Sequence, residues 1–225
     1  MIEWVWERAS GMACLSEVVV ATDSAEVVAV CEGVGARAVL TDPGHPSGTD
    51  RVAEVAAREG FSSWEVVVNL QGDEPLMEAE PVAAAVQEVR AGRPIGTCAT
   101  PILDPDDLGD PGVVKVVLRD DGTALYFSRA PIPFRRDGQM DGAFLHRKPA
   151  LRHLGVYAYR REALMEWVSL PPSRLEVIER LEQLRALEAG MSIGVAVVRK
   201  AEGGVDTLAD ARRIEQRMRE LGLGS

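Results

Sequence analysis

Apolar positions along the chain follow two spacings. In some stretches they recur every three to four residues, as on the buried face of a helix, and in others they form short continuous runs, as in a buried strand. The helical spacing predicts helices over residues 2–11, 24–33, 49–59, 81–91, 162–168 and 173–190. The continuous runs predict strands over residues 17–21, 36–40, 66–70, 95–100, 154–159 and 192–198. Because helices and strands alternate, we predict an α/β fold with a mostly parallel central sheet and helices on both of its faces.

Capping residues mark the starts of two of these helices. Ser47 and Asp50 form a cap-like pair where helix 49–59 begins, and Ser173 with Glu176 matches a capping box. The helix that follows this box carries an apolar stripe made of Leu175, Ile178, Leu181, Leu184 and Leu187. We therefore predict one continuous helix that ends at Gly190.

The pattern changes between residues 113 and 160. Two extended runs flank Asp120-Asp121-Gly122, which is a hairpin signal. Residues 135–152 contain few apolar side chains and show no clear period, as expected for a mobile arm. We predict a single domain over residues 1–225, in which 113–160 supply a hairpin and an arm at a subunit contact.

Composition narrows the class of partner. The formal net charge is −10 at pH 7 and the isoelectric point is near 4.9, which argues against nucleic acid or an anionic membrane as the main partner. The three cysteines lack metal-ligand spacing and are odd in number, so we expect reduced thiols. No stretch reaches transmembrane length and no secretory signal is visible, so we expect a cytoplasmic protein.

The strongest chemical signal is the loop after strand 66–70, where the β-branched run breaks into Gln71-Gly72-Asp73-Glu74-Pro75. In open parallel sheets ligands bind beyond the carboxyl ends of the strands, which is where Asp73 is expected. The alternative is that Asp73 or Glu74 only caps the following helix.

A second acid follows strand 192–198. The turn Gly203–Thr207 places Asp206 between that strand and a final helix, so Asp206 and Asp73 could emerge at the same edge of the sheet. Two such carboxylates suit one Mg²⁺ ion, which takes oxygen ligands and keeps positions open for phosphate. The alternative is that Asp206 or Thr207 caps the final helix.

Three other polar positions each allow a functional and a purely structural interpretation. The segment 46–51 places small hydroxyl residues and Arg51 at a helix start, which favours an anion, but Arg51 could instead pair with an exposed acid. His153 alone could be a structural or surface histidine. Glu182, on a helix otherwise rich in leucine, could be a solvated residue.

Taken together, eight motifs closely resemble the 3-deoxy-manno-octulosonate cytidylyltransferase family in order and spacing. The motifs are ATD at 21–23, SGTDR at 47–51, VNLQGDEP at 68–75, VKVV at 114–117, ALYFSRAPIP at 124–133, HLGVYAYR at 153–160, LEQLRALE at 181–188 and GVDT at 204–207. The resemblance covers nearly the whole chain, and SGTDR, QGDEP, FSRAPIP and LEQLR are highly specific for the family.

The resemblance implies a fold like that of nucleotide-diphospho-sugar transferases, a cytoplasmic homodimer, and a reaction in which CTP and 3-deoxy-manno-octulosonate (Kdo) give CMP-Kdo and pyrophosphate for lipopolysaccharide biosynthesis. It implies that Asp73 and Asp206 bind Mg²⁺ and that Arg51 and Gln71, together with Asp73, contact the nucleotide. It also implies a sugar-acid pocket lined by Arg129, His153, Tyr157, Glu182 and Gln183.

The resemblance also raises an expectation about the front of the chain, because family members begin with an apolar strand and a phosphate-binding loop rich in Arg, Gly and Lys. Met1-Ile2 matches a point just after that loop, so we expect both features to be missing from this sequence. Two readings compete with a Kdo enzyme. One is a catalytically dead homologue that binds a nucleotide or sugar acid, and the other is a cytidylyltransferase for a related sugar acid such as 8-amino Kdo.

Overall fold

The computed structural model describes residues 1–199, 212, 215–216 and 219–220, and these residues form two compact units. The first, which we call the N-terminal unit, comprises Met1–Ser63 and Asn69–Ala79. The second, which we call the sheet unit, comprises Trp64–Val68 and the segment that begins at Glu80. Within the described residues no helix is both long and apolar enough to cross a membrane.

The N-terminal unit combines three helices with a short parallel sheet. Its elements are α1 (Ile2–Ser10), β1 (Val19–Thr22), α2 (Ala25–Gly33), β2 (Arg37–Leu40), α3 (Gly48–Ala57) and the 3-10 turn η1 (Glu59–Phe61). Strands β1 and β2 pair in parallel. A small core of Val20, Cys31 and Ala36 packs under Ile2 and Trp6 of α1, so burial of apolar side chains holds α1 and α2 to the strands.

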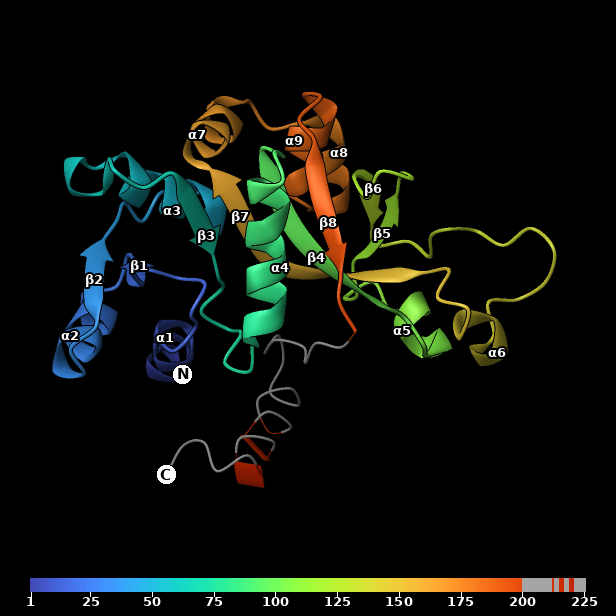
Figure 1. The fold of residues 1–225 in the computed structure, drawn as a ribbon, viewed down its shortest axis with the longest axis horizontal. Helices are drawn as coiled ribbons and strands as arrows, with labels where there is room; N and C mark the ends of the chain where they lie inside the picture. The colour runs from blue at the N-terminus through green and yellow to red at the C-terminus, as the bar shows by residue number, and fades with distance from the viewer. Residues whose placement is uncertain (200–211, 213–214, 217–218, 221–225) are drawn as a thin grey trace. The chain divides into compact units, whose positions relative to one another are not determined.

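The sheet unit contains a six-stranded sheet and most of the remaining helices (Figure 1). Its strands are β3 (Val66–Asn69), β4 (Ile95–Pro101), β5 (Lys115–Leu118), β6 (Ala124–Ser128), β7 (Leu151–Arg160) and β8 (Ile193–Val197). Its helices are α4 (Ala79–Arg90), α5 (Pro105–Gly109), α6 (Gly142–Leu145), α7 (Arg161–Ser169), α8 (Arg174–Glu179) and α9 (Gln183–Glu188). The boundary between the units crosses β3 and α4 one residue from their ends.

The sheet is mixed, which corrects the prediction of a mostly parallel one. The strand order is β6-β5-β7-β4-β8, and β3 pairs with β7. Strand β4 runs parallel to β8, but β7 is antiparallel to both β4 and β5, and β5 forms an antiparallel hairpin with β6. Apolar runs do not encode strand direction, and the predicted hairpin around Asp120-Asp121-Gly122 already introduces an antiparallel pair.

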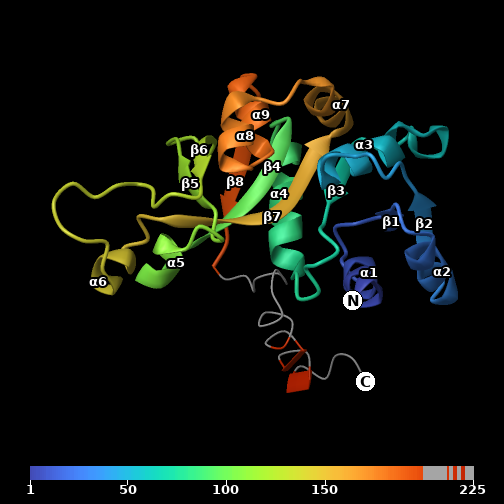
Figure 2. The ribbon, with the colours of Figure 1, turned by 180° about the vertical axis from the view of Figure 1, so that it is seen from behind.

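Helices cover both faces of this sheet, as predicted, with α4 on one face and the α8–α9 pair on the other (Figures 1 and 2). The close approach of α4 depends on a missing side chain, because a Cβ on Gly96 of β4 would lie 2.2 Å from the carbonyl oxygen of Ala85. On β7, the rings of Tyr157 and Tyr159 stack 5.8 Å apart and meet Trp167 of α7 edge-on. These aromatic contacts join α7 to the centre of the sheet.

The predicted helix over 173–190 is two helices. The capping box is present, since Ser173 accepts from the N–H of Glu176 and the Glu176 side chain accepts from that of Ser173. Arg180 then adopts a left-handed conformation with φ 53° and ends α8, and α9 begins at Gln183. The stripe is also interrupted, because Ile178 is 66% exposed. The predicted stripe is confirmed at Leu181 and Leu184, which are buried, but the apolar spacing does not reveal the sharp turn between the two helices.

The segment 135–152 contributes to the core at its C-terminal end. Leu145 of α6 and Ala150 are fully buried against Ile102, Leu108 and Val113. The arm is therefore anchored by a small apolar cluster, although its apolar residues are too few to show a period in the sequence.

Candidate active site

Asp73 lies in the turn that follows β3, where its side chain is partly buried. Helix α4 begins at Ala79, so the residue immediately before the helix is Glu78. Neither Asp73 nor Glu74 occupies the capping position, and the alternative that these acids only cap the helix is wrong. The structure leaves Asp73 in a loop at the carboxyl end of a buried strand, where a ligand-binding acid is expected.

Gln71 is brought beside the first turn of α3 within the N-terminal unit. A Cβ added to Gly48 would lie 3.0 Å from Nε2 of Gln71, so glycine at this position leaves room for the amide. The same amide donates to Oδ1 of Asn69 over 3.3 Å. The Nδ2 group of Asn69 is buried with no hydrogen-bond partner within the described chain. A buried donor in this state points to a bound ligand or water.

Arg51 lies in α3, whose N-terminus is capped as predicted by Ser47. Its guanidinium donates to Oδ2 of Asp23 over 2.8 Å and to Oγ1 of Thr41 over 2.6 Å. Asp23 is exposed, so the alternative that Arg51 pairs with an exposed acid is confirmed in this structure. A partly exposed ion pair contributes little to stability and can be exchanged for a phosphate. A role for Arg51 in nucleotide binding stays a prediction.

Glu54 holds the loop before α3 in place. Its carboxylate accepts from Arg58, from the N–H of Asp42 and from Nε2 of His45. The hydrogen bond from Arg58, followed by those from Asp42 and His45, lowers the pKa of Glu54 to about 2. The loop that leads to Ser47 and Arg51 is therefore anchored by an ionised carboxylate.

His153 lies on β7 in the interior of the sheet and is partly buried, so it is not an exposed surface histidine. Its ring meets Phe127 edge-on at 5.0 Å and lies 5.3 Å from the ring of Tyr157. Burial lowers the pKa of His153 to about 3. The imidazole is therefore neutral at physiological pH, so it carries one N–H donor and one acceptor nitrogen but no positive charge.

Tyr157 interacts with both His153 and Glu182: its ring lies 5.3 Å from that of His153, and the charge of Glu182 acts on its hydroxyl. The Tyr157 hydroxyl is buried and has no hydrogen-bond partner within the described residues. Burial and then the charges of Tyr159 and Glu182 raise the pKa of Tyr157 well above its ordinary value, so the hydroxyl keeps its proton. Glu182 is half-buried at the start of α9 and Gln183, the next residue, is 4% exposed. The unsatisfied hydroxyl of Tyr157 therefore belongs to a residue that interacts with a neutral imidazole and with a carboxylate.

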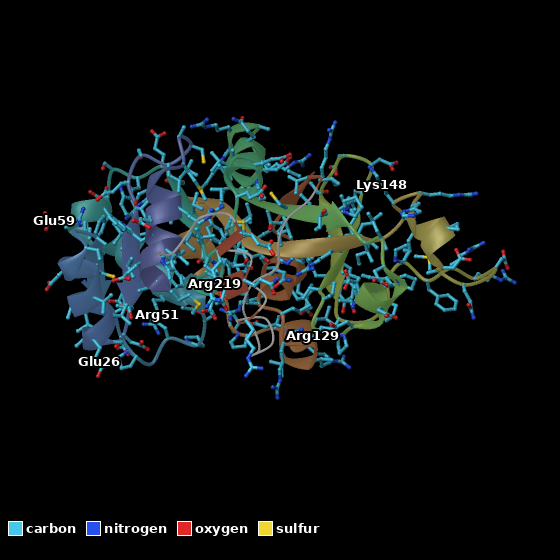
Figure 3. The ribbon with its side chains drawn as sticks, turned by 90° about the horizontal axis from the view of Figure 1, so that it is seen from below. Glu26, Arg51, Glu59, Arg129, Lys148 and Arg219 are labelled. Carbon is cyan, nitrogen blue, oxygen red and sulfur yellow. The ribbon has the colours of Figure 1, made fainter. Side chains whose placement is uncertain are left out.

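Arg129, which is labelled in Figure 3, follows β6 and reaches the end of α8. Its Nε donates to the carbonyl oxygen of Glu179 over 2.9 Å, and its terminal nitrogens donate to the carbonyls of Pro111 and Arg180. These bonds use three of the five N–H donors of a guanidinium, so two remain for a ligand.

The expected metal site cannot be completed from the described part of the chain. Asp206, the predicted partner of Asp73, lies outside the described residues. Within those residues no group of three or more His, Cys, Asp or Glu side chains is arranged to hold a metal ion. A single protein carboxylate still fits Mg²⁺, which usually binds proteins through one or two carboxylates plus water and substrate phosphate.

Three further contacts near the candidate residues were not predicted from the sequence. Thr97 of β4 lies 3.0 Å from His153, Asn69 carries the unsatisfied amide beside Gln71, and Glu179 accepts three hydrogen bonds near Arg129. Thr97 and Asn69 each interrupt an apolar strand with a polar side chain, which is a usable signal. Glu179 has no such signal, because it resembles any acid on an exposed helix.

Comparison with known proteins gives consistent matches. A profile of the cytidylyltransferase family matches residues 1–193. A 3-deoxy-manno-octulosonate cytidylyltransferase from Gemmatimonas aurantiaca is 54% identical over 93% of this chain and 80% of its own length. Another from Syntrophotalea carbinolica is 44% identical over 98% of this chain and 89% of its own. A solved structure of CMP:2-keto-3-deoxy-manno-octonic acid synthetase in complex with CTP has a TM-score of 0.87 and 36% identity, covering 98% of this chain and 88% of that one.

Proposed function

Because the chain belongs to the 3-deoxy-manno-octulosonate cytidylyltransferase family, we propose that it is a nucleotidyltransferase that converts CTP and Kdo to CMP-Kdo and pyrophosphate. The product is the activated form of Kdo for lipopolysaccharide biosynthesis. The observation that supports the sugar-acid side best is the buried Tyr157 hydroxyl without a partner, beside His153 and Glu182. A buried hydroxyl that is left without a partner favours a ligand rich in hydroxyl groups.

The proposed reaction is a displacement at phosphorus. The anomeric hydroxyl oxygen of Kdo attacks the α-phosphorus of CTP, the bond from that phosphorus to the bridging oxygen breaks, and pyrophosphate leaves with the electron pair. The hydroxyl proton passes to solvent. Catalysis of such a step rests mainly on positioning and on offsetting negative charge. In our proposal Arg51, Gln71 and Asp73 act on the nucleotide, and Arg129, His153, Tyr157, Glu182 and Gln183 hold the sugar acid.

The sugar-acid residues have distinct tasks in this proposal. Glu182 and the neutral His153 accept hydrogen bonds from sugar hydroxyls, while Tyr157 and Gln183 donate. The carboxylate of Kdo needs a cation, and the two remaining N–H groups of Arg129 can supply it. Discrimination then follows from leaving these buried groups unpaired when an analogue lacks a hydroxyl.

We further propose that Mg²⁺ is the cofactor and that Asp73 and Asp206 hold it. The carboxylate of Asp73, placed in a partly buried turn and not used as a helix cap, suits this ion. When bound, Mg²⁺ would offset phosphate charge and lower the pKa of an attacking hydroxyl. Asp73 itself supplies a fixed negative charge that orients the ion relative to the nucleotide.

The proposed assembly is a homodimer in which the arm over residues 135–152 contributes to the contact. The arm carries basic side chains on a chain of net charge −10, and Lys148 lies beside α6 (Figure 3). Phe134, just before it, is 86% exposed, while the guanidinium of Arg135 lies 3.9 Å from the centre of the Phe144 ring. An exposed aromatic ring flanked by cations suits an interface with an acidic partner such as a second copy.

The proposed location is the cytoplasm. Cys31 and Cys98 are buried free thiols, and burial raises the pKa of Cys98 to about 12. Unpaired thiols of this kind suit a reducing compartment.

The test of the proposed function is pyrophosphate release by the purified chain. With CTP, Kdo and Mg²⁺ we expect CTP-dependent release and a product with the mass of CMP-Kdo, and excess EDTA should stop the reaction. A panel containing 8-amino Kdo and other octulosonic acids decides the sugar acid. Binding of CTP without turnover on any member of the panel would instead identify a catalytically dead binding protein.

A further inference from the structure

The backbone of Arg129 is held on both sides by charged groups, one partly buried and one fully buried. Its N–H donates to Oε2 of Glu179 over 3.0 Å, and its carbonyl oxygen accepts from Nζ of Lys115 over 2.5 Å. Lys115 is fully buried and donates as well to the carbonyls of Asp110 and Val113. The start of the Arg129 side chain is therefore fixed in position before any ligand binds.

Glu179 is the centre of this arrangement. Its Oε1 accepts from Ser128 Oγ over 2.7 Å and from the Tyr126 hydroxyl over 3.3 Å, while Oε2 accepts from Arg129. Burial raises the pKa of Glu179, but the bonds from Arg129, Ser128 and Tyr126 outweigh it and the net pKa is lowered. The carboxylate is thus ionised, and only an ionised carboxylate can accept from all three donors without donating.

Glu179 is also the last residue of α8, directly before the left-handed turn at Arg180. The Arg129 guanidinium donates to the backbone carbonyls of both residues and so holds the turn from one side. On the other side, Arg185 of α9 forms a bidentate pair with Glu176 of α8. The turn that carries Glu182 is therefore fixed at both ends by charge-assisted hydrogen bonds.

We propose that Glu179 is a positioning residue for the sugar acid, which sets the Arg129 guanidinium and the α8–α9 turn that carries Glu182 and Gln183. This inference rests on the proposed function. Glu179 does not contact Kdo in this proposal. It acts by fixing a cation (Arg129), an acceptor (Glu182) and a donor (Gln183) at separations that match one substrate.

The test compares Michaelis constants for the two substrates in wild type, Glu179→Ala and Glu179→Gln. In Glu179→Ala three donors lose their acceptor, and the KM for Kdo should rise about tenfold, the change that corresponds to one lost hydrogen bond. The KM for CTP should stay within about twofold of wild type, since the nucleotide does not use this turn. Glu179→Gln keeps the shape of the side chain but loses its charge, so its KM for Kdo should lie between those of wild type and Glu179→Ala.

Matched variants separate positioning from general stability. Glu166→Ala removes an exposed acid of α7 in the same unit and should leave both Michaelis constants unchanged. Ser128→Ala removes one hydrogen bond of Glu179 and gives a milder rise in the KM for Kdo, which keeps the test valid if Glu179→Ala does not fold. Wild-type Michaelis constants in both Glu179 variants, or equal changes for CTP and Kdo, would overturn the inference while leaving the proposed function intact. An inactive wild type would overturn the proposed function itself.

Discussion

The Thr97 hydroxyl lies 3.0 Å from Nε2 of His153 and 2.7 Å from the carbonyl oxygen of Val156. A carbonyl only accepts, so the single O–H of Thr97 donates to Val156. Its oxygen can then accept the proton that Nε2 of His153 carries. Thr97 thereby selects one tautomer of the neutral imidazole and leaves Nδ1 as an acceptor for a substrate hydroxyl.

The first prediction is that His153 does not titrate in the physiological range. Its pKa of about 3 lies below the ordinary value of 6.5, because burial disfavours the cation. Proton NMR should find that one of the three histidine ring signals is constant from pH 8 to about 5. The His153→Gln variant assigns that signal by removing it. Titration of the assigned signal near pH 6.5 would contradict the lowered pKa of His153.

The same shift has a consequence for stability. Protonation of His153 favours the unfolded chain, because the ring binds a proton more readily there than in the folded protein. The free energy of unfolding is therefore undiminished by His153 above about pH 6.5, and it falls by about 1.4 kcal/mol per pH unit as the pH drops toward 3. The lowered pKa values of Glu54, Glu176 and Glu179 also make the free energy of unfolding fall at acid pH, and they do so equally in wild type and in His153→Gln. Urea unfolding between pH 4 and 7 should therefore show a smaller slope in His153→Gln than in wild type.

The second prediction is that Asp73→Asn abolishes turnover without unfolding the protein. The substitution removes the carboxylate that we propose binds Mg²⁺ from a partly buried turn, and it removes no apolar side chain from the core. The activity should fall at least about a hundredfold with saturating Mg²⁺, while the thermal midpoint stays near that of wild type. Asp120→Asn, at an exposed hairpin position, is the matched control. Normal turnover in Asp73→Asn would contradict the proposal that this residue binds Mg²⁺. We expect the same loss of activity for Asp206→Asn.

The third prediction concerns the room that Gly48 leaves for Gln71. In Gly48→Ala the new Cβ would meet the Gln71 amide at 3.0 Å, and the flexible side chain has to turn away. The KM for CTP should rise about fivefold, since one neutral hydrogen bond is lost, with the KM for Kdo unchanged. Gly33→Ala, where a Cβ meets nothing within 4 Å, serves as the control. Equal effects of both variants would indicate that Gln71 has no part in nucleotide binding.

The fourth prediction separates a buried ion pair from an exposed one. Arg185 and Glu176 are 7% and 13% exposed and 2.5 Å apart, so Glu176→Ala leaves a buried guanidinium without its partner and should lower the free energy of unfolding by about 3 kcal/mol. Arg37 and Glu17 are at a similar distance but are 51% and 37% exposed, and Glu17→Ala should cost less than about 1 kcal/mol. Urea denaturation measures both. Similar losses in the two variants would show that burial does not set the strength of these pairs here.

Much of the architecture could be predicted from local patterns. The elements over residues 2–101 lie within a few positions of the predicted ranges, and the caps at Ser47 and Ser173 form as expected, because caps and amphipathic spacing act over a few residues. Local patterns could not predict the direction of β7 or the break between α8 and α9 at Arg180. Strand direction depends on partners far along the chain, and a left-handed arginine has no local sequence signal.

The candidate site likewise contains positions that local sequence indicates and contacts between residues far apart in the chain. Asp73 and Gln71 belong to a loop whose character is local, and the resemblance of motifs supplied the remaining positions. Thr97 and His153 are 56 residues apart, and Tyr126 reaches Glu179 across 53. Contacts of this range depend on the register of the sheet, which no periodicity of side chains reveals.

The buried ammonium group of Lys115 gives the protein a built-in reporter of its own unfolding. The sequence contains only three lysines, and this one is fully enclosed while three carbonyl oxygens occupy its N–H donors. An acylating reagent needs a free, deprotonated amine in contact with water. Acylation of Lys115 would therefore proceed through opening of the hairpin region, and its rate would record how often β5 and β6 separate from the α8–α9 turn.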